Sequence, residues 1–313
     1  MNNLRIAAIV VTYNRKALLE ECINAILSQT YELENILVIN NASTDETSEY
    51  LSEVSRVCKR VNYITLEENV GGAGGFAYGI KELHGQYDWI WIMDDDTIPD
   101  SDCLEKLVKP IKPDTNYSFL TSYVYSVDGL PMNTPGVATL HKEENGYGRC
   151  LQFLYKKMVE IEFATFVSVL ISDKAITKVG YPCAFFFIWG DDIEYTRRLV
   201  KYYGPAYVVG DSRACHKRIG ASNLSVMEED NINRIKFYKY NVRNSLIISK
   251  EYLSKEAHRD NIKNRVRTIL KVALKPTKKK KEKLKALCQG LLEYILKRYD
   301  VVAFRDRFST KPL

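Results

Sequence analysis

Residues 87–96 read YDWIWIMDDD, an apolar run that ends in three consecutive carboxylates. Six of the first seven residues are aromatic, β-branched or Met, so the run predicts a strand buried in a sheet. Adjacent carboxylates repel one another, and a divalent cation that also holds phosphate oxygens is a common reason to place three of them at the edge of a core. A solvated turn that caps a following helix is the alternative interpretation.

The composition is that of a soluble globular protein. The chain has 313 residues, of which 46% are hydrophobic and 27% charged, enough for one large domain or slightly more. The net charge of +6 is too mild to indicate a nucleic-acid partner. Seven scattered cysteines without a C-x-x-C pair predict free thiols in a reducing cytoplasm. We expect no signal peptide and no membrane span.

Strand-like and helix-like runs alternate over the first hundred residues. Apolar runs at 5–12, 35–40 and 61–66 precede the run at 87–96, and a helical pattern follows each of the first three. This alternation predicts an α/β fold with a mostly parallel, doubly wound sheet flanked by helices. Ligands of such sheets bind beyond the carboxyl ends of the strands. The polar or glycine-rich loops expected at that edge are 12–15, 40–41, 69–75 and 94–96.

The second half of the chain repeats the motif of an apolar run that ends in acid. Residues 185–190 lead into Asp191 and Asp192, where a helix is predicted to begin. Residues 160–170 predict a further strand, and the Gly-, Pro- and Asn-rich segment 129–148 predicts a loop over the site.

The C-terminal part changes character. We predict an α/β domain over residues 1–220 and a helical, basic region over 221–313. Residues 271–298 combine a lysine cluster with an apolar stripe, which predicts a basic amphipathic helix. This helix either packs on the main domain or contacts anionic lipid at the inner face of the cell membrane.

The glycine-rich loop permits two interpretations. Gly72, Gly74 and Ala77 satisfy the dinucleotide fingerprint, and Asp94 follows about 20 residues later, so a nicotinamide-dependent oxidoreductase is one candidate. However, the fingerprint normally follows the first strand, whereas this loop follows the third. The glycines would equally let the backbone approach a sugar nucleotide closely.

A nucleotide-sugar transferase accounts for more of these features. A divalent ion held by Asp94 or Asp96 would neutralise a diphosphate leaving group. His216, near the last predicted strand, is a candidate further ligand, and imidazole with carboxylate suits Mn²⁺ or Mg²⁺. A structural role for this histidine is the alternative.

The second acid pair suits the chemistry of transfer. Inversion at a sugar carbon requires a carboxylate that takes the proton of the acceptor hydroxyl, and Asp191 and Asp192 could supply it. A helix N-cap is the alternative role for this pair. Trp189, just before them, is either a platform for a sugar ring or a core residue.

Five motifs in register resemble one enzyme family over roughly residues 5 to 220. They are VVTYNR at 10–15, NNASTD at 40–45, NVGGAGGF at 69–76, the triple Asp and WGDDIEY at 189–195. Together they look like glycosyltransferase family two, the inverting enzymes with the GT-A fold. The glycine-rich motif is similar to that of bacterial galactofuranosyltransferases and their rhamnosyltransferase relatives, as is YNVRN at 240–244.

The resemblance implies a role for each matching residue. The residues implied to bind the nucleotide sugar are Thr12, Tyr13, Arg15, Asn40, Asn41, Asn69, Gly71, Gly72, Asp94 and Asp95. Asp96 and His216 would hold the metal, Asp192 would be the catalytic base, and Trp189 and Asp191 would bind the acceptor. Asn40 replaces the acid that recognises uracil in the family, which leaves uridine and thymidine donors open.

The expected activity is metal-dependent, inverting transfer of galactofuranose from UDP-galactofuranose to a hydroxyl of a lipid-linked bacterial surface polysaccharide. A rhamnosyltransferase that uses dTDP-rhamnose and the NAD(P)-dependent oxidoreductase are the alternatives. We expect a cytoplasmic enzyme, peripheral at the inner membrane face, and a homo-oligomer is compatible with this interpretation.

Overall fold

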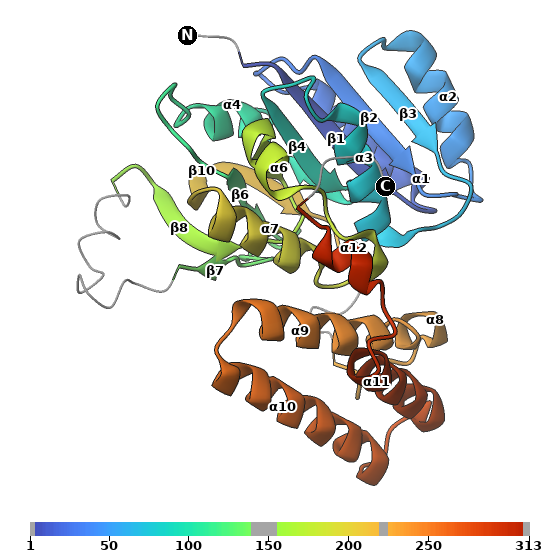
Figure 1. The fold of residues 1–313 in the computed structure, drawn as a ribbon. Coiled ribbons are helices and arrows are strands. Elements are labelled where there is room, and N and C mark those ends of the chain that lie inside the picture. The colour runs from blue at the N-terminus through green and yellow to red at the C-terminus, as the bar shows by residue number, and fades with distance from the viewer. Residues whose placement is uncertain (1–3, 139–154, 219–224, 309–313) are drawn as a thin grey trace.

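The computed structural model describes residues 4–138, 155–218 and 225–308 (Figure 1). The strands are β1 (Ile6–Thr12), β2 (Asn35–Asn40), β3 (Val61–Thr65), β4 (Trp89–Asp94), β5 (Thr97–Pro99), β6 (Phe119–Tyr125), β7 (Gly136–Val137), β8 (Met158–Phe163), β9 (Val169–Ser172) and β10 (Ala206–His216). The helices are α1 (Lys16–Leu27), α2 (Thr47–Val57), α3 (Gly71–Leu83), α4 (Cys103–Val108), α6 (Asp173–Val179), the 3-10 helix η2 (Ala184–Phe186), α7 (Asp191–Tyr202), α8 (Ile232–Ile235), α9 (Tyr238–Tyr252), α10 (Lys255–Leu274), α11 (Lys280–Ile295) and α12 (Val301–Arg305).

One mixed sheet runs through the α/β part, in the order β3-β2-β1-β4-β9-β6-β10-β8-β7, with β5 paired to β10. The strands β1 to β4 are parallel to one another, as predicted, because a crossover helix connects each of them to the next. The second half departs from the doubly wound pattern, since β9 runs antiparallel to both β4 and β6. The predicted α/β fold with helices on the sheet is confirmed.

The single strand predicted over residues 160–170 is wrong. The structure divides this segment into β8, which ends at Phe163, and β9, which begins at Val169. Ser168 between them has a φ of 56°, a left-handed conformation that no strand can contain. The break sends β8 to pair with β10 and β9 to the centre of the sheet beside β4.

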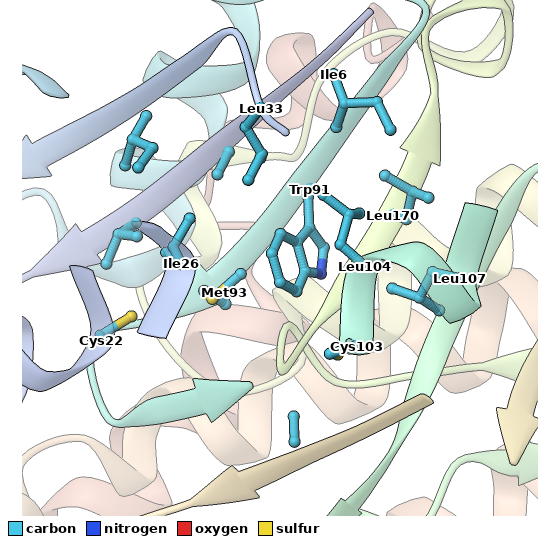
Figure 2. Packing of buried hydrophobic residues seen from close by; sticks show 14 of the residues in the cluster. Ile6, Cys22, Ile26, Leu33, Trp91, Met93, Cys103, Leu104, Leu107 and Leu170 are labelled. Carbon is cyan, nitrogen blue, oxygen red and sulfur yellow. The ribbon is translucent and has the colours of Figure 1, made fainter. Parts of the chain in front are cut away.

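The core around Trp91 fixes the position of β4. Figure 2 shows this side chain close to Leu104 and Leu107 of α4 and to Leu170 of β9. Trp91 is fully buried, and its indole Nε1 donates a hydrogen bond to Ser168 Oγ at 3.1 Å. This packing anchors the strand that leads into the acids, and β1 pairs with its last residue, Asp94.

The glycines of α3 pack the helix against β1. A Cβ on Gly75 would lie 2.6 Å from Val11 Cγ1, and one on Gly79 would lie 2.8 Å from Ile9 Cγ2. Contacts this short admit no side chain, so these glycines set the distance between helix and strand. Within the fingerprint itself, a Cβ on Gly74 would lie 2.5 Å from Val70 Cγ2, so local packing also requires that glycine.

The C-terminal helices α8 to α11 form a layer beside the α/β part (Figure 1). The single helix predicted over residues 271–298 is wrong, since α10 ends at Leu274 and α11 begins at Lys280, with Pro276 between them. The predicted apolar stripe is largely core: Leu287 is buried, and Leu284 and Leu291 pack on the same cluster. The domain boundary predicted at residue 220 lies outside the described residues and stays a prediction.

Two structural details complete the fold. Within the described residues, no helix combines the length and apolar character needed to cross a membrane.

The chain returns from the helical layer through α12, which lies beside α7 (Figure 1). There the buried pair of Glu194 and Arg198 on α7, 3.1 Å apart, meets the backbone and side chain of Arg307.

Candidate active site

The triple Asp lies in the tight connection between β4 and β5. Antiparallel pairing of β5 with β10 places Thr97 opposite His216, and this register brings the imidazole beside the preceding acid. His216 Nε2 lies 3.0 Å from Asp96 Oδ1, and both side chains are buried. Two residues 120 positions apart in the chain thus meet through a three-residue strand.

Asp94, Asp96 and His216 together could hold a metal ion. One ligand atom from each lies within 4.8 Å of the others. The set combines carboxylate oxygen with imidazole nitrogen, which suits Mn²⁺ or Mg²⁺. Asp96 and His216 were predicted to hold the metal and Asp94 to bind the donor, whereas the structure brings all three side chains together.

Asn133 orients the histidine and was missed by sequence reasoning. Its Oδ1 lies 2.7 Å from His216 Nδ1, and its Nδ2 donates to Thr165 Oγ1 at 3.1 Å. The amide oxygen can only accept, so Nδ1 donates to it and Nε2 is the ring nitrogen that faces Asp96. A cation between Nε2 and the carboxylate suits this arrangement. Asn133 lies in the predicted loop 129–148, of which residues 139–148 lie outside the described residues.

The side chain of Asp95, which is predicted to bind the donor, is buried and hydrogen-bonded within the protein. Its Oδ2 accepts a hydrogen bond from Thr12 Oγ1 at 2.7 Å, and its Oδ1 accepts one from Arg15 at 3.2 Å. The Arg15 guanidinium also reaches Asp96 Oδ2 at 2.8 Å, while its side chain stays 48% exposed. Asp95 therefore braces the end of β1 against β4 and holds Arg15 at the mouth of the site.

The three acids differ in acidity for physical reasons. Burial, followed by the charges of Asp96 and Asp95, raises the pKa of Asp94 well above its ordinary value. Burial raises the pKa of Asp95 to about 6, although Arg15 opposes the shift. Burial also acts on Asp96, but the hydrogen bond and charge of His216 outweigh it and lower the pKa of this carboxyl. Crowded buried acids of this kind gain from a bound cation.

The asparagines at the end of β2 shape the loops around the site. Asn40 is fully buried, donates to Ser48 Oγ and accepts from Ser43 N, so its side chain has no surface for a nucleotide. Asn41 accepts from Val70 N at 2.9 Å and donates to Gly71 O at 3.0 Å, which ties β2 to the glycine-rich loop.

The remaining predicted donor residues lie at the surface of this edge or just behind it. Tyr13 is exposed, and a Cβ on Gly72 would meet open space, so both can face a ligand. Asn69 is half-buried and accepts from Gly71 N at 2.8 Å. Gly71 itself is buried with a φ of 74°, which favours glycine there.

The second acid pair begins helix α7. Asp191 is buried and Asp192 half-buried, and Gly190 before them has a φ of 102°. Burial raises the pKa of Asp192 to about 6, although the Ile193 backbone N–H donates to its Oδ1 at 2.7 Å. Asp191 lies near enough to the first cluster that its charge contributes to the raised pKa of Asp94. The loop before the acid pair also contacts the start of α3, where Ala73 N donates to Phe187 O at 3.2 Å, so the pair follows a loop that lies against the glycine-rich loop.

Trp189 has a structural role beside any contact with a ligand. Its ring packs edge-on against Tyr238, with centroids 5.2 Å apart, and against Phe237 at 6.3 Å. The side chain is half-buried and belongs to the hydrophobic cluster of the C-terminal helices. The predicted sugar platform thus also joins the acid-bearing loop to α9.

The sequence model described as "Glycosyl transferase family 2" matches residues 7–176. The chain belongs to glycosyltransferase family 2. The matched residues include the triple Asp and the glycine-rich loop. The second acid pair and His216 lie beyond them. Membership in this family leaves no place for the NAD(P)-dependent oxidoreductase.

Two relatives of this family 2 chain are bacterial. An uncharacterized glycosyltransferase of Haemophilus influenzae is 33% identical over 119 residues, which cover 38% of this chain and 36% of that protein. The galactofuranosyltransferase GlfT1 of Mycolicibacterium smegmatis is 26% identical over 214 residues, which cover 63% of this chain and 65% of GlfT1. The chain thus matches less than two thirds of the length of either relative.

Solved structures share the fold at low identity. GalNAc-T7, crystallised with UDP, GalNAc and Mn²⁺, superposes with a TM-score of 0.58 and 14% identity, covering 83% of this chain and 55% of that one. This similarity places the family 2 chain among the GT-A folds, as predicted.

Proposed function

We propose that the protein is an inverting glycosyltransferase that transfers galactofuranose from UDP-galactofuranose to a hydroxyl of a lipid-linked bacterial surface polysaccharide. The observation that carries this proposal is the group of Asp94, Asp96 and His216 at the carboxyl edge of the sheet, where one ligand atom from each lies within 4.8 Å of the others. The similarity to GlfT1 over 214 residues supports the choice of donor.

Each cluster has its own task in the proposed reaction. Asp192 accepts the proton of the acceptor hydroxyl while that oxygen forms a bond to the anomeric carbon from the side opposite the leaving group. The bond between this carbon and the diphosphate oxygen breaks, the electron pair leaves with UDP, and the configuration inverts. With a pKa of about 6, Asp192 is ionised at neutral pH and able to take the proton.

Asp94, Asp96 and His216 would hold the divalent cation. When bound, this ion supplies a positive charge that stabilises the departing diphosphate. Arg15, held by Asp95 and Asp96 and half-exposed, adds a second positive charge beside the same phosphates. Asn133 keeps His216 in the tautomer that binds the ion through Nε2.

A donor panel tests the proposal. Purified protein with Mn²⁺ and a lipid-linked acceptor is supplied in turn with UDP-galactofuranose, UDP-galactopyranose and dTDP-rhamnose, and the product is followed by mass spectrometry. We expect transfer from UDP-galactofuranose alone. Transfer from dTDP-rhamnose would support the rhamnosyltransferase alternative, and hydrolysis without transfer from every donor would contradict both.

Replacing Asp96 tests the metal site. We expect Asp96→Ala to weaken the binding of UDP in the presence of Mn²⁺ by roughly 100-fold, because it removes both a ligand and the partner of His216. Isothermal titration calorimetry with and without Mn²⁺ measures the effect. Asp102→Ala, which removes only an ion pair with Lys106 on α4, is the matched control. Equal affinity of the wild type for UDP with and without the ion would contradict the metal assignment.

The proposed membrane contact lies on α10, not on the stripe first predicted. Val266, Leu270 and Leu274 occur at every fourth position and are 40%, 52% and 80% exposed. Basic side chains flank them at 259, 263, 267 and 271. An apolar stripe bordered by cations suits the headgroup region of an anionic membrane, which agrees with a cytoplasmic enzyme at the inner membrane face.

Vesicle sedimentation checks this contact. We expect the wild type to sediment with vesicles that contain phosphatidylglycerol and to stay in solution with phosphatidylcholine alone. The double variant Leu270→Ser, Leu274→Ser should bind at least about tenfold more weakly, because it removes most of the apolar area of the stripe. Val57→Ser, at a 90% exposed position on α2, is the control. Unchanged sedimentation of the double variant would place the contact elsewhere.

A further inference from the structure

The loop that precedes the acid pair is conformationally strained. Phe187, Trp189 and Gly190 have φ values of 64°, 61° and 102°. Bulky aromatic residues rarely adopt the left-handed region, so such a loop persists only where its surroundings hold it in place. The strained residues end where α7 begins, and they therefore set the position of Asp191 and Asp192.

A buried amide contacts the backbone of this loop at three carbonyl oxygens. Nδ2 of Asn244 on α9 lies 3.0 Å from Phe186 O, 3.1 Å from Ile188 O and 2.9 Å from Trp189 O. Its side chain is fully buried. The orientation of the amide follows from its partners, because the two N–H groups of Nδ2 must face the carbonyl oxygens while Oδ1 accepts from Arg243 Nε at 3.0 Å.

The same loop contacts the donor side of the site. Phe187 O accepts a hydrogen bond from Ala73 N at 3.2 Å, and a Cβ on Gly71 would lie 2.1 Å from this oxygen. The loop is therefore held between the N-terminus of α3 and the buried face of α9. Arg243 strengthens the second contact, since its guanidinium donates to Phe185 O at 2.6 Å.

We propose that Asn244 is a positioning residue for the transfer reaction, and that its amide holds the strained loop so that the carboxylate of Asp192 faces the acceptor hydroxyl. This inference rests on the proposed role of Asp192 as the base. It assigns the C-terminal helices a part in catalysis, because α9 supplies a contact that the α/β part lacks.

Replacing Asn244 by aspartate tests the donor function of the amide separately from its acceptor function. Asn244→Asp keeps the size of the side chain and the oxygen that accepts from Arg243, but it removes the N–H groups that reach the carbonyls. We expect kcat for transfer to fall about 100-fold, because a small displacement of a catalytic group has that effect. The affinity for UDP with Mn²⁺ should stay at the wild-type value.

Tryptophan fluorescence provides a readout that is independent of activity. Trp89 and Trp91 are buried in the sheet, so a change in acrylamide quenching reports on Trp189 in the loop. We expect quenching to increase in Asn244→Asp. Asn241→Ala is the matched control, since Asn241 lies one turn earlier on α9 and bonds to Arg265 instead of the loop. It should keep wild-type kcat and quenching.

A second variant disturbs the loop from within. Gly190→Ala places a Cβ 3.0 Å from Ile248 Cδ1 at a φ of 102°, and it should lower kcat in the same way without loss of UDP binding. Wild-type kcat in both Asn244→Asp and Gly190→Ala, together with an inactive Asp192→Asn, would overturn the proposed role of Asn244 and leave the base assignment intact. Wild-type kcat in Asp192→Asn would overturn the base assignment instead. Parallel loss of UDP binding and transfer would show a general loss of structure and would also overturn the positioning role.

Discussion

Asp192→Asn is expected to fold, to bind UDP with Mn²⁺, and to transfer sugar at least about 1,000-fold more slowly than the wild type. The amide has nearly the shape of the carboxylate but cannot accept the acceptor proton. The helix start is preserved, because the amide oxygen still accepts from Ile193 N. Single-turnover transfer and calorimetry with UDP measure the two effects separately. Asp211→Asn, at an acid paired with Lys157 on the surface, should be fully active.

The pH profile of the wild type adds a second check on Asp192. A base with its pKa raised to about 6 is active above this pH and is protonated below it, so kcat should fall as the pH drops through about 6. UDP binding must be followed over the same range, because the metal ligands also take up protons. A kcat that stays constant down to pH values well below 6 would contradict the assignment.

Arg198→Ala is expected to give the largest loss of stability. The side chain is fully buried, pairs with Glu194 at 3.1 Å and donates to Val179 O and Tyr181 O at 2.8 Å. Removal leaves the Glu194 carboxylate buried with one cation fewer, which costs about 3–5 kcal/mol in the free energy of unfolding. The melting temperature should fall by roughly 10 °C.

Arg197 provides the matched control for this effect. It is the neighbouring residue on α7 and pairs with Glu162 in a partly exposed position. Arg197→Ala should cost about 1 kcal/mol or less, as partly exposed ion pairs usually do. Equal melting temperatures for the Arg197 and Arg198 variants would mean that the buried pair contributes no more than a surface one.

Sequence reasoning succeeded where a pattern is local. The apolar runs that became β1, β2 and β4 are continuous because these strands are buried on both faces, and the rule for parallel sheets then placed their loops at one edge. The sequence also indicated that the triple Asp and His216 lie in the same site. The helix break at Pro276 was available in the sequence and was overlooked.

Sequence reasoning failed where long-range contacts decide the structure. No Gly or Pro marks the left-handed turn at Ser168, which only the packing of β9 beside β4 explains. Asn133 and Asn244 are ordinary amides until the fold brings them to His216 and to the strained loop. The inward orientation of Asp95 depends on Thr12, at the end of β1, and on Arg15, just before α1.

The contact between α7 and Arg307 has a consequence for biosynthesis. Arg198 donates to the backbone oxygen of Arg307, a residue 109 positions later in the chain. A ribosome therefore exposes the complete sheet well before the charges of α7 gain their last partner. Docking of α7 during this interval would bury its ionic pair without the last partner. This cost favours docking of α7 late in folding. Docking of the helix that carries the proposed base is thus coupled to the arrival of Arg307, just beyond α12.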